Sequence, residues 1–390
     1  MSRCARAKRR GFSSVAAILL TVIGIVTLLL VVNWTYLNLA SRRMQDLAET
    51  LAWSAVYELL DDEKLQDAPV FDQVDDISDT EAAIETPTSG LLAQNNAASG
   101  PTLQVTDSDL MLTFGRIENA NSPIGIGDFL LPPFGTDPYN TLRVEIFRDP
   151  GGMNPVELLI RGFGAPNAAK ISGAAYVTLD SRVTAFRPTL TTNAPLAPLA
   201  IDEAAWFSSR TAGGIDTNGN GRFELRARLR TTAGTGDFNS VLISLDSAAG
   251  LNSSLIPTQV TAGATPADVG GTGLFGPATA ASGGELTTDA ERDSPTNVAA
   301  IATAFSDVAA SLRPTRVFPI YSTYGDPVEI VGYVGARILG ASLQNISGSN
   351  RLVVRVEPEF IVHPTAVTQF THASATVPEN IYIHKIRLTR

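Results

Sequence analysis

The chain is 390 residues long and carries 39 acidic against 29 basic residues, a formal net charge of −10. Such a chain offers no broad basic surface to neutralise phosphates, so nucleic acid is excluded as a partner. The single cysteine, Cys4, excludes both a disulfide-stapled fold and a thiolate zinc site.

An uncharged segment near the N-terminus is long enough to cross a membrane. No charged residue occurs between Arg10 and Arg42, and every residue from Phe12 to Val32 is apolar or is small and hydroxylated. A spanning helix needs about 20 such residues, whereas the apolar part of a signal peptide has about 7 to 15. Trp34 and Tyr36 follow, as aromatic residues do at a membrane interface. The sequence therefore predicts a transmembrane helix at residues 12–36, with the lipid bilayer as its partner.

The basic residues around this segment predict its orientation. Five of them precede it, and only Arg42 and Arg43 follow it closely. The side richer in Lys and Arg stays in the cytoplasm. Residues 1–11 are therefore expected to form a cytoplasmic basic tail of a single-pass membrane protein. The C-terminal remainder, which holds all 39 acidic residues, is expected in the periplasm or outside the cell.

Residues 37–60 are predicted to continue as an amphipathic stem helix. Apolar residues recur there every three or four positions, on one helical face; they are Met44, Leu47, Ala48, Leu51, Ala52, Ala55, Val56 and Leu59. This face packs either on the protein's own domain or on a partner, and the pattern does not choose between them. Residues 61–100 are predicted to be an acidic and polar linker, because positions 61–85 hold ten acidic residues and one basic residue.

Residues 101–390 are predicted to form an exported β-rich domain. Segments such as "TLRVEIFR" and "FELRARLR" alternate apolar and polar residues, as strands do, and Gly, Pro, Asn and Asp clusters separate them. The expected fold class is mainly β, an antiparallel sandwich or distorted barrel, with an N-terminal transmembrane plus amphipathic helix. One helix is expected near residues 296–312, where apolar residues at helical spacing lie between two prolines.

Segments that could indicate an enzyme lack the context that catalysis needs. The glycines of "GTGLFG" at 271–276 match a dinucleotide-binding fingerprint, but no predicted strand precedes them. His363, His372 and His384 are widely spaced, and no carboxylate pattern accompanies them, so a zinc site is not favoured. No HExxH motif or nucleophile elbow occurs. We therefore expect a non-enzymatic protein, and an anchored hydrolase is the least favoured class.

One short loop, "DTNGNGRFE", is a candidate calcium site. Calcium binds six to eight hard oxygens, and this spacing brings oxygens together around a sharp glycine turn. The expected ligands are side chains or a carbonyl of Asp216, Asn218, Asn220, Arg222 and Glu224. Ala227 stands at the twelfth position, where an EF-hand has glutamate, and the Asn-Gly-Asn-Gly run also suits a tight hairpin. Weak calcium binding and a simple turn both remain open, and no other cofactor is indicated.

The start of the stem helix carries a family resemblance. After the apolar helix, "SRRMQDLAETLAWSA" continues into an alanine-rich acidic helix through Met44, Gln45, Ala48, Glu49, Ala52 and Ala55. The first 60 residues thereby resemble the TadE/TadG-like proteins of bacterial Tad (Flp) pilus assembly. More loosely, "FRPTLTTNAPLAPLAI" and "VEPEFIVHPTAVT" resemble the exported part of long TadG-like chains. The resemblance implies other Tad pilus-assembly or envelope proteins as partners.

The chain differs from the family pattern in two features. Gly11 and Phe12 would suit a prepilin cleavage site, but Ala16 stands where pilins carry a glutamate, which indicates an uncleaved signal-anchor. The DxSxS metal motif of a von Willebrand A domain is absent from the sequence. The function expected is that of an accessory or minor component of a Tad-type pilus or cell-adhesion assembly in the cell envelope. The alternative is a membrane-anchored surface-binding protein, stabilised by calcium and unrelated to pili.

Overall fold

The structure is a computed structural model that describes most of the chain. The residues described are 3–60, 84, 88–96, 104–117, 129–131, 139–149, 155–159, 168–211, 215–229, 238–243, 245, 254–268, 295–323, 329–346, 349–368 and 382–389. The "GTGLFG" stretch and His372 lie outside these residues. Of the predicted 61–100 linker, residues 88–96 are described and helical, and Ile84 and Leu92 are buried against the stem helix.

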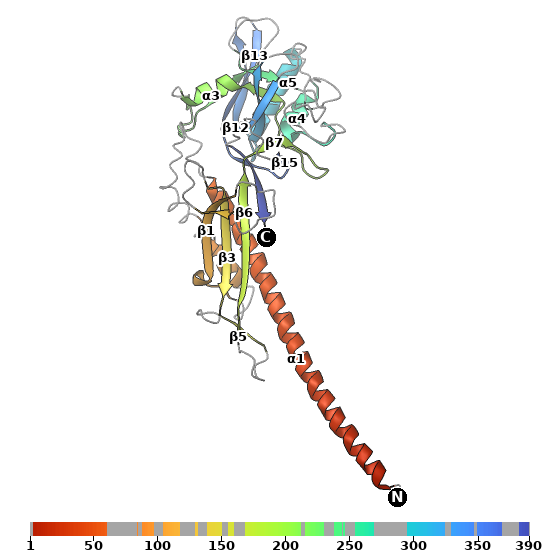
Figure 1. Ribbon diagram of the computed structural model, residues 1–390. Coiled ribbons are helices and arrows are strands. Elements are labelled where there is room, and N and C mark those ends of the chain that lie inside the picture. Colours follow the sequence, from red (N-terminus) through yellow and green to blue (C-terminus); the bar gives the residue numbers. More distant parts are fainter. Residues whose placement is uncertain are drawn as a thin grey trace.

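A single helix, α1 (Arg3–Ala55), runs through the predicted membrane segment and on into the predicted stem. Its first half projects away from the rest of the molecule (Figure 1). Apolar side chains along this half, from Val15 to Trp34, are exposed. The most apolar window of the helix has a mean hydropathy of 3.1, and none of it is buried. One helix of this length and composition near the N-terminus is compatible with a single-pass membrane anchor.

The second half of α1 is buried along the face that the sequence pattern predicts. Met44, Ala48 and Leu51 are almost fully buried in a cluster that includes Leu142 and Val177 of two neighbouring strands. A short 3₁₀ helix, η1 (Val56–Leu59), follows α1 and continues the buried face. The stem therefore packs on the protein's own sheet, which decides the alternative that the sequence left open.

The sheet beneath the stem, here called the proximal sheet, has the strand order β14-β16-β6-β3-β1-β2. Its neighbours are antiparallel except β14 and β16, which are parallel. The strand bounds are β1 (Leu110–Ile117), β2 (Phe129–Leu130), β3 (Thr141–Arg148), β6 (Ile171–Asp180), β14 (Ile361–Val362) and β16 (Ile383–Thr389). A 3₁₀ turn, η4 (Asp107–Asp109), precedes β1. Strands from both ends of the chain thus build one sheet.

The second large sheet, here called the distal sheet, has the order β10-β8-β11-β12-β13-β9. It lies farther from the exposed half of α1 (Figure 1). Helices and strands in this part are β8 (Leu199–Asp202), α3 (Glu203–Thr211), β9 (Leu225–Arg228), β10 (Ser240–Leu242), α4 (Ile256–Ala262), α5 (Pro295–Ala309), β11 (Thr315–Thr323), β12 (Glu329–Ile346) and β13 (Ser349–Pro358). Helix α5 covers one face of β12 and β13, and its Phe305 shares a buried core with Phe318 of β11.

Two small sheets complete the described fold. They pair β4 (Val156–Glu157) with β5 (Ala168–Ala169), and β7 (Val183–Phe186) with β15 (Ala366–Thr368). The predicted mainly β fold with an N-terminal transmembrane plus amphipathic helix is confirmed. The segment "TLRVEIFR" is β3, and the helix expected near 296–312 is α5.

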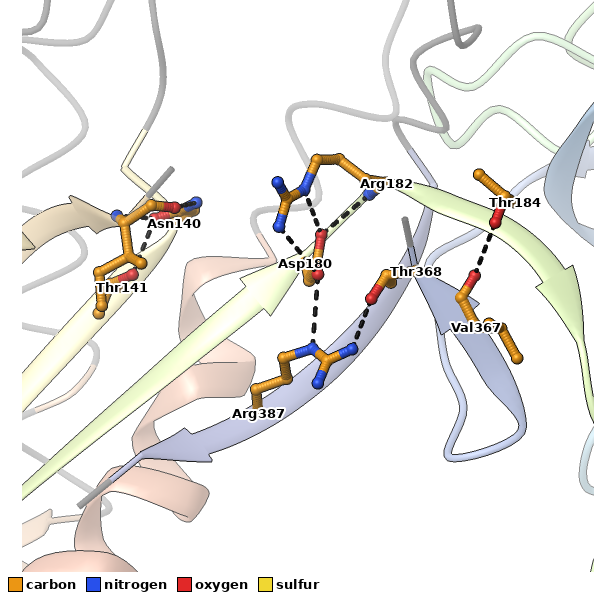
Figure 2. A network of polar contacts seen from close by, with 9 residues as sticks. Asn140, Thr141, Asp180, Arg182, Thr184, Val367, Thr368 and Arg387 are labelled. Atoms are coloured by element: carbon orange, nitrogen blue, oxygen red, sulfur yellow. Dashed lines mark hydrogen bonds and ion pairs between the residues drawn. The ribbon is translucent and has the colours of Figure 1, made fainter. Parts of the chain in front are cut away.

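A buried carboxylate links the proximal sheet to the pair β7 and β15 (Figure 2). Asp180, at the end of β6, accepts hydrogen bonds from Arg182 Nε at 2.9 Å and Nη2 at 3.2 Å. Asp180 Oδ2, which accepts from Arg182 Nη2, also lies 3.4 Å from Nε of Arg387 on β16. Arg387 in turn donates to Thr368 Oγ1 on β15 at 2.6 Å. One acidic side chain thus connects β6, β16 and, through Arg387, β15.

Candidate functional site

The predicted calcium loop lies between α3 and β9, at the edge of the distal sheet. Ile215 and Glu224 close it as an antiparallel bridge, in which the Glu224 N–H donates to the Ile215 carbonyl at 2.8 Å. Gly219 and Gly221 have φ angles of 72° and 80°. Glycine is favoured at such angles because it has no Cβ. The segment is therefore a closed turn whose glycines stand where the backbone is left-handed.

Asp216 organises this turn through its carboxylate. Its Oδ1 accepts the Gly219 N–H at 2.7 Å, and its Oδ2 accepts the Gly221 N–H at 2.9 Å. These backbone hydrogen bonds, that from Gly221 above all, lower the pKa of Asp216 because they stabilise its ionised form. Asp216 thus keeps its charge at the exposed rim of the loop.

Asn218 and Asn220 converge on one buried carboxylate from β13. Their Nδ2 atoms donate to Glu357 Oε2 at 2.9 Å and 3.0 Å. Their own amide oxygens accept backbone N–H groups of Asn220, at 3.2 Å, and of Arg222, at 2.9 Å. The loop is therefore fastened to the distal sheet through Glu357, which is fully buried.

Glu224 is a second buried carboxylate, 3% exposed, directly below the loop. Its Oε1 accepts hydrogen bonds from the backbone N–H of Thr217, at 2.9 Å, and from the Thr217 hydroxyl. The β9–β13 register pairs Leu225 with Val356, so Glu224 and Glu357 are the next opposed pair. Leu225 and Val356 belong to the core beneath α5. The two carboxylates consequently share the opposite face of the sheet.

Each of these carboxylates has one oxygen without a hydrogen-bond partner, Glu224 Oε2 and Glu357 Oε1. Glu224 Oε2 lies 3.8 Å from Arg355 Nη1, and Glu357 Oε1 lies 3.8 Å from Arg337 Nη1. These distances are too long for hydrogen bonds, and both arginines are partly exposed. Two like charges opposed across neighbouring strands destabilise a sheet unless cations compensate them. The site thus concentrates negative charge that the arginines balance only at a distance.

The sequence-predicted residues are gathered here in part. Asp216, Asn218, Asn220 and Glu224 all surround the turn, but both asparagines direct nitrogen, not oxygen, toward Glu357. For Arg222 the expected ligand was its carbonyl; its guanidinium pairs with Glu359 at 2.8 Å. Within the described part of the chain, no three His, Cys, Asp or Glu side chains lie close enough to hold a metal by themselves.

Sequence reasoning missed Glu357, which is central to the site. Alternation in "RLVVRVEPEF" indicates that positions 355, 357 and 359 share one face of a strand. The pattern does not show which strand lies next to it, because the pairing of β9 with β13 joins segments far apart in the sequence. The sequence therefore indicated which face of the strand carries Glu357, but it did not indicate that β9 lies beside this strand.

Two of the three histidines are described. His363 Nδ1 lies 2.7 Å from Thr365 Oγ1, and the His363 N–H donates to the His384 carbonyl at 3.2 Å. Burial lowers the pKa of His363 to about 4. These contacts account for His363 as a structural residue of the β14–β16 junction.

Comparisons with family models, with curated proteins and with solved structures give no match for this chain. Its function is therefore argued from the fold and from the polar loop.

Proposed function

We propose that the protein is a non-enzymatic, membrane-anchored accessory or minor component of a Tad-type pilus or adhesion assembly. The observation that supports this most is the division of α1. One half of the helix is exposed and apolar, and the other half is buried in the proximal sheet. The anchor and the folded part are therefore joined without a hinge in the helix.

A continuous helix of this kind fixes the distance between the membrane and the folded part of the protein. Its 53 residues span about 80 Å at a rise of about 1.5 Å per residue. The exposed half suits a bilayer because its apolar side chains would otherwise face water. Lateral association of such helices would place the attached sheets at a set height beside an envelope assembly. The basic tail argues for a cytoplasmic N-terminus and for a periplasmic or extracellular C-terminal part.

A second candidate is a membrane-anchored surface-binding protein unrelated to pili. The polar loop favours it, since a cluster of charged and amide side chains stands at the edge of the distal sheet, remote from the anchor (Figure 1). Genes for a Tad secretion ATPase and a prepilin peptidase beside the coding gene would favour the pilus role over this one.

The decisive experiment is deletion of the gene in the producing cells, with pili counted by electron microscopy and adhesion measured in parallel. We expect fewer pili, restored by the wild-type gene. A complementing variant with Gly24→Arg, which puts a charge in the exposed apolar half where no side chain is near, should fail to restore them because it weakens anchoring. Unchanged pilus number with lost adhesion would overturn the pilus role and support the second candidate.

Topology is tested separately by reporters fused after Arg390. An export-dependent reporter should be active, and a cytoplasm-dependent reporter should be silent. Activity of the cytoplasmic reporter would overturn both membrane-display roles, because the sheets would then face the cytoplasm.

A further inference from the structure

One face of the distal sheet carries a row of arginines across the strands β12, β13 and β9. The opposite face of these strands belongs to the buried core beneath α5, where Leu225 pairs with Val356. Side chains alternate between the two faces of a strand. The alternate positions therefore lie on the outer face, and they include five arginines, here called the arginine row: Arg226, Arg228, Arg337, Arg351 and Arg355.

The strand register sets the order of the row. Arg355 of β13 lies opposite Arg226 of β9, and Arg228 lies two residues farther along β9. Arg337 of β12 lies opposite Glu357, two residues from Arg355 in the other direction along β13. The row thus crosses three strands obliquely. Arg337 and Arg228 are separated by four residues of β13, which is about 13 Å at about 3.3 Å per residue.

The row holds more positive charge than the neighbouring carboxylates balance. Two buried glutamates lie 3.8 Å from Arg355 and Arg337. Nε of Arg226 has no hydrogen-bond partner, and neither has Nε of Arg351, a residue that is only 4% exposed. Buried polar atoms are nearly always hydrogen-bonded, and like charges directly opposite each other destabilise a sheet. The opposition of Arg355 and Arg226 therefore costs stability that a bound anion would restore.

The row is open to a large ligand. Strands β12 and β13 lie at the end of the molecule remote from the exposed half of α1 (Figure 1). The side chains of Arg355 and Arg337 are 41% and 49% exposed. Ser342 and Gln344 of β12 continue the same face and are exposed. A ligand on this face would meet guanidinium, hydroxyl and amide groups together.

We propose that the arginine row binds an acidic polysaccharide whose sugars carry carboxylate groups. Arginine presents a planar fork of N–H donors that matches a carboxylate. A row about 13 Å long is longer than one carboxylate, so it fits several of them along an extended chain. Ser342 and Gln344 offer hydrogen-bond partners for sugar hydroxyls. An acidic peptide fits less well, because peptides that bind to sheets add a strand at an edge, whereas the row lies on a face.

This inference goes beyond the pilus role and does not depend on it. For the second candidate function it names the class of ligand. Binding is measured on the purified protein, so its failure would leave the pilus role untouched, and the deletion phenotype tests that role by itself.

The test is binding of the full chain, in nonionic detergent micelles, to immobilised polygalacturonate, measured by biolayer interferometry. Uncharged dextran and poly-L-glutamate, immobilised in the same way, are the comparison polymers. We expect binding to polygalacturonate, none to dextran and markedly weaker binding to poly-L-glutamate. Binding should weaken as NaCl rises from about 0.05 M to about 0.5 M, because salt screens exposed charges.

Two results with these polymers would overturn the proposal. Equal binding to dextran, or binding that salt leaves unchanged, would remove charge as its basis. Binding to poly-L-glutamate as tight as that to polygalacturonate would replace the polysaccharide by an acidic protein.

Arg226→Gln tests the row directly, because it removes the charge and keeps a polar side chain. It should weaken polygalacturonate binding about fivefold, the upper effect of an exposed charge pair. Without polymer its melting temperature should equal or exceed that of the wild type, because the repulsion from Arg355 is relieved. A lower melting temperature would assign Arg226 to the stability of the fold and overturn its role in the row.

Arg187→Gln is the matched control. Arg187 directly follows β7, is exposed and lies outside the row. This variant makes the same change of charge and should bind polygalacturonate as the wild type does. Equal binding by Arg226→Gln and Arg187→Gln would overturn the site.

Discussion

The side chain of Gln45 pairs with the backbone of Ala174 as a neighbouring strand would. Gln45 Nε2 donates to the Ala174 carbonyl at 2.8 Å, and Gln45 Oε1 accepts the Ala174 N–H at 3.2 Å. On one side β6 pairs with β3, where Ala174 faces Glu145. On the other side β16 extends only as far as Tyr176. Gln45 therefore satisfies the strand just beyond the end of β16 and sets the position of α1 along the sheet.

The first prediction follows from this pair. Gln45→Leu should lower the free energy of unfolding by about 1–3 kcal/mol, because it leaves the Ala174 N–H and carbonyl without partners under the helix. Chemical denaturation of the full chain in detergent, followed by tryptophan fluorescence, measures the change.

Two further substitutions test whether the lost hydrogen bonds to Ala174 cause the destabilisation. Gln45→Glu keeps an acceptor for the Ala174 N–H but places a charged oxygen against its carbonyl, so it should also destabilise. Thr50→Ala removes an exposed hydroxyl that bonds only to its own helix at Asp46, and it should change the unfolding free energy by less than about 0.5 kcal/mol. Equal effects of Gln45→Leu and Thr50→Ala would contradict the strand-like role of Gln45.

The second prediction concerns Gly173, next to that pair. A Cβ at Gly173 would lie 2.5 Å from the backbone carbonyl of Met44, so any side chain would force α1 away from β6. Gly173→Ala should destabilise the protein by about 3 kcal/mol or more, at the upper end of the cost of overpacking. Gly340→Ala on β12 is the control, because its Cβ would meet only the Arg355 side chain at 3.8 Å. The contact of α1 with β6 is not as close as described if both variants melt alike.

These contacts mark the limit of what the sequence predicts. The alternation of β3 and the stripe through Met44 and Leu51 are local patterns, so both elements and their buried faces were predictable. The contact of Gln45 with Ala174 spans 129 positions, and no local pattern encodes it. The same holds for Glu357. Its face followed from alternation, but the loop that covers it is 137 to 139 positions away.

The third prediction is a pH dependence that comes from His363. Burial lowers its pKa from 6.5 to about 4, so between these values the unfolded chain binds a proton that the folded chain does not. The stability contributed by neutral His363 is therefore complete above pH 6.5 and is lost as the pH falls toward 4.

A variant isolates this effect from the carboxylates that titrate in the same window. His363→Gln does not titrate and can still bond to Thr365. The unfolding free energy of the wild type, measured relative to this variant by urea denaturation, should decline from pH 6.5 to pH 4. Parallel pH profiles of the two proteins would contradict the assignment.

The last prediction concerns the junction held by Asp180. Its side chain is 1% exposed, while Arg182 and Arg387 are each 24% exposed, so water screens the arginines in part. Breaking a fully buried ion pair costs about 3–5 kcal/mol, and we expect Asp180→Asn to cost less, about 2 kcal/mol. The loss should be concentrated in β16, because Arg387 is the residue of this strand that contacts Asp180 of β6, and it also donates to Thr368 of β15. Hydrogen exchange should therefore accelerate at the β16 amides, while the buried half of α1 stays protected.

Asp149→Asn is the matched control, since Asp149 pairs with Lys170 where both side chains are largely exposed, and such pairs contribute about 0–1 kcal/mol. If β16 exchanges at the same rate in Asp180→Asn and in Asp149→Asn, β16 is held by its backbone hydrogen bonds to β6 and not by the Asp180 carboxylate.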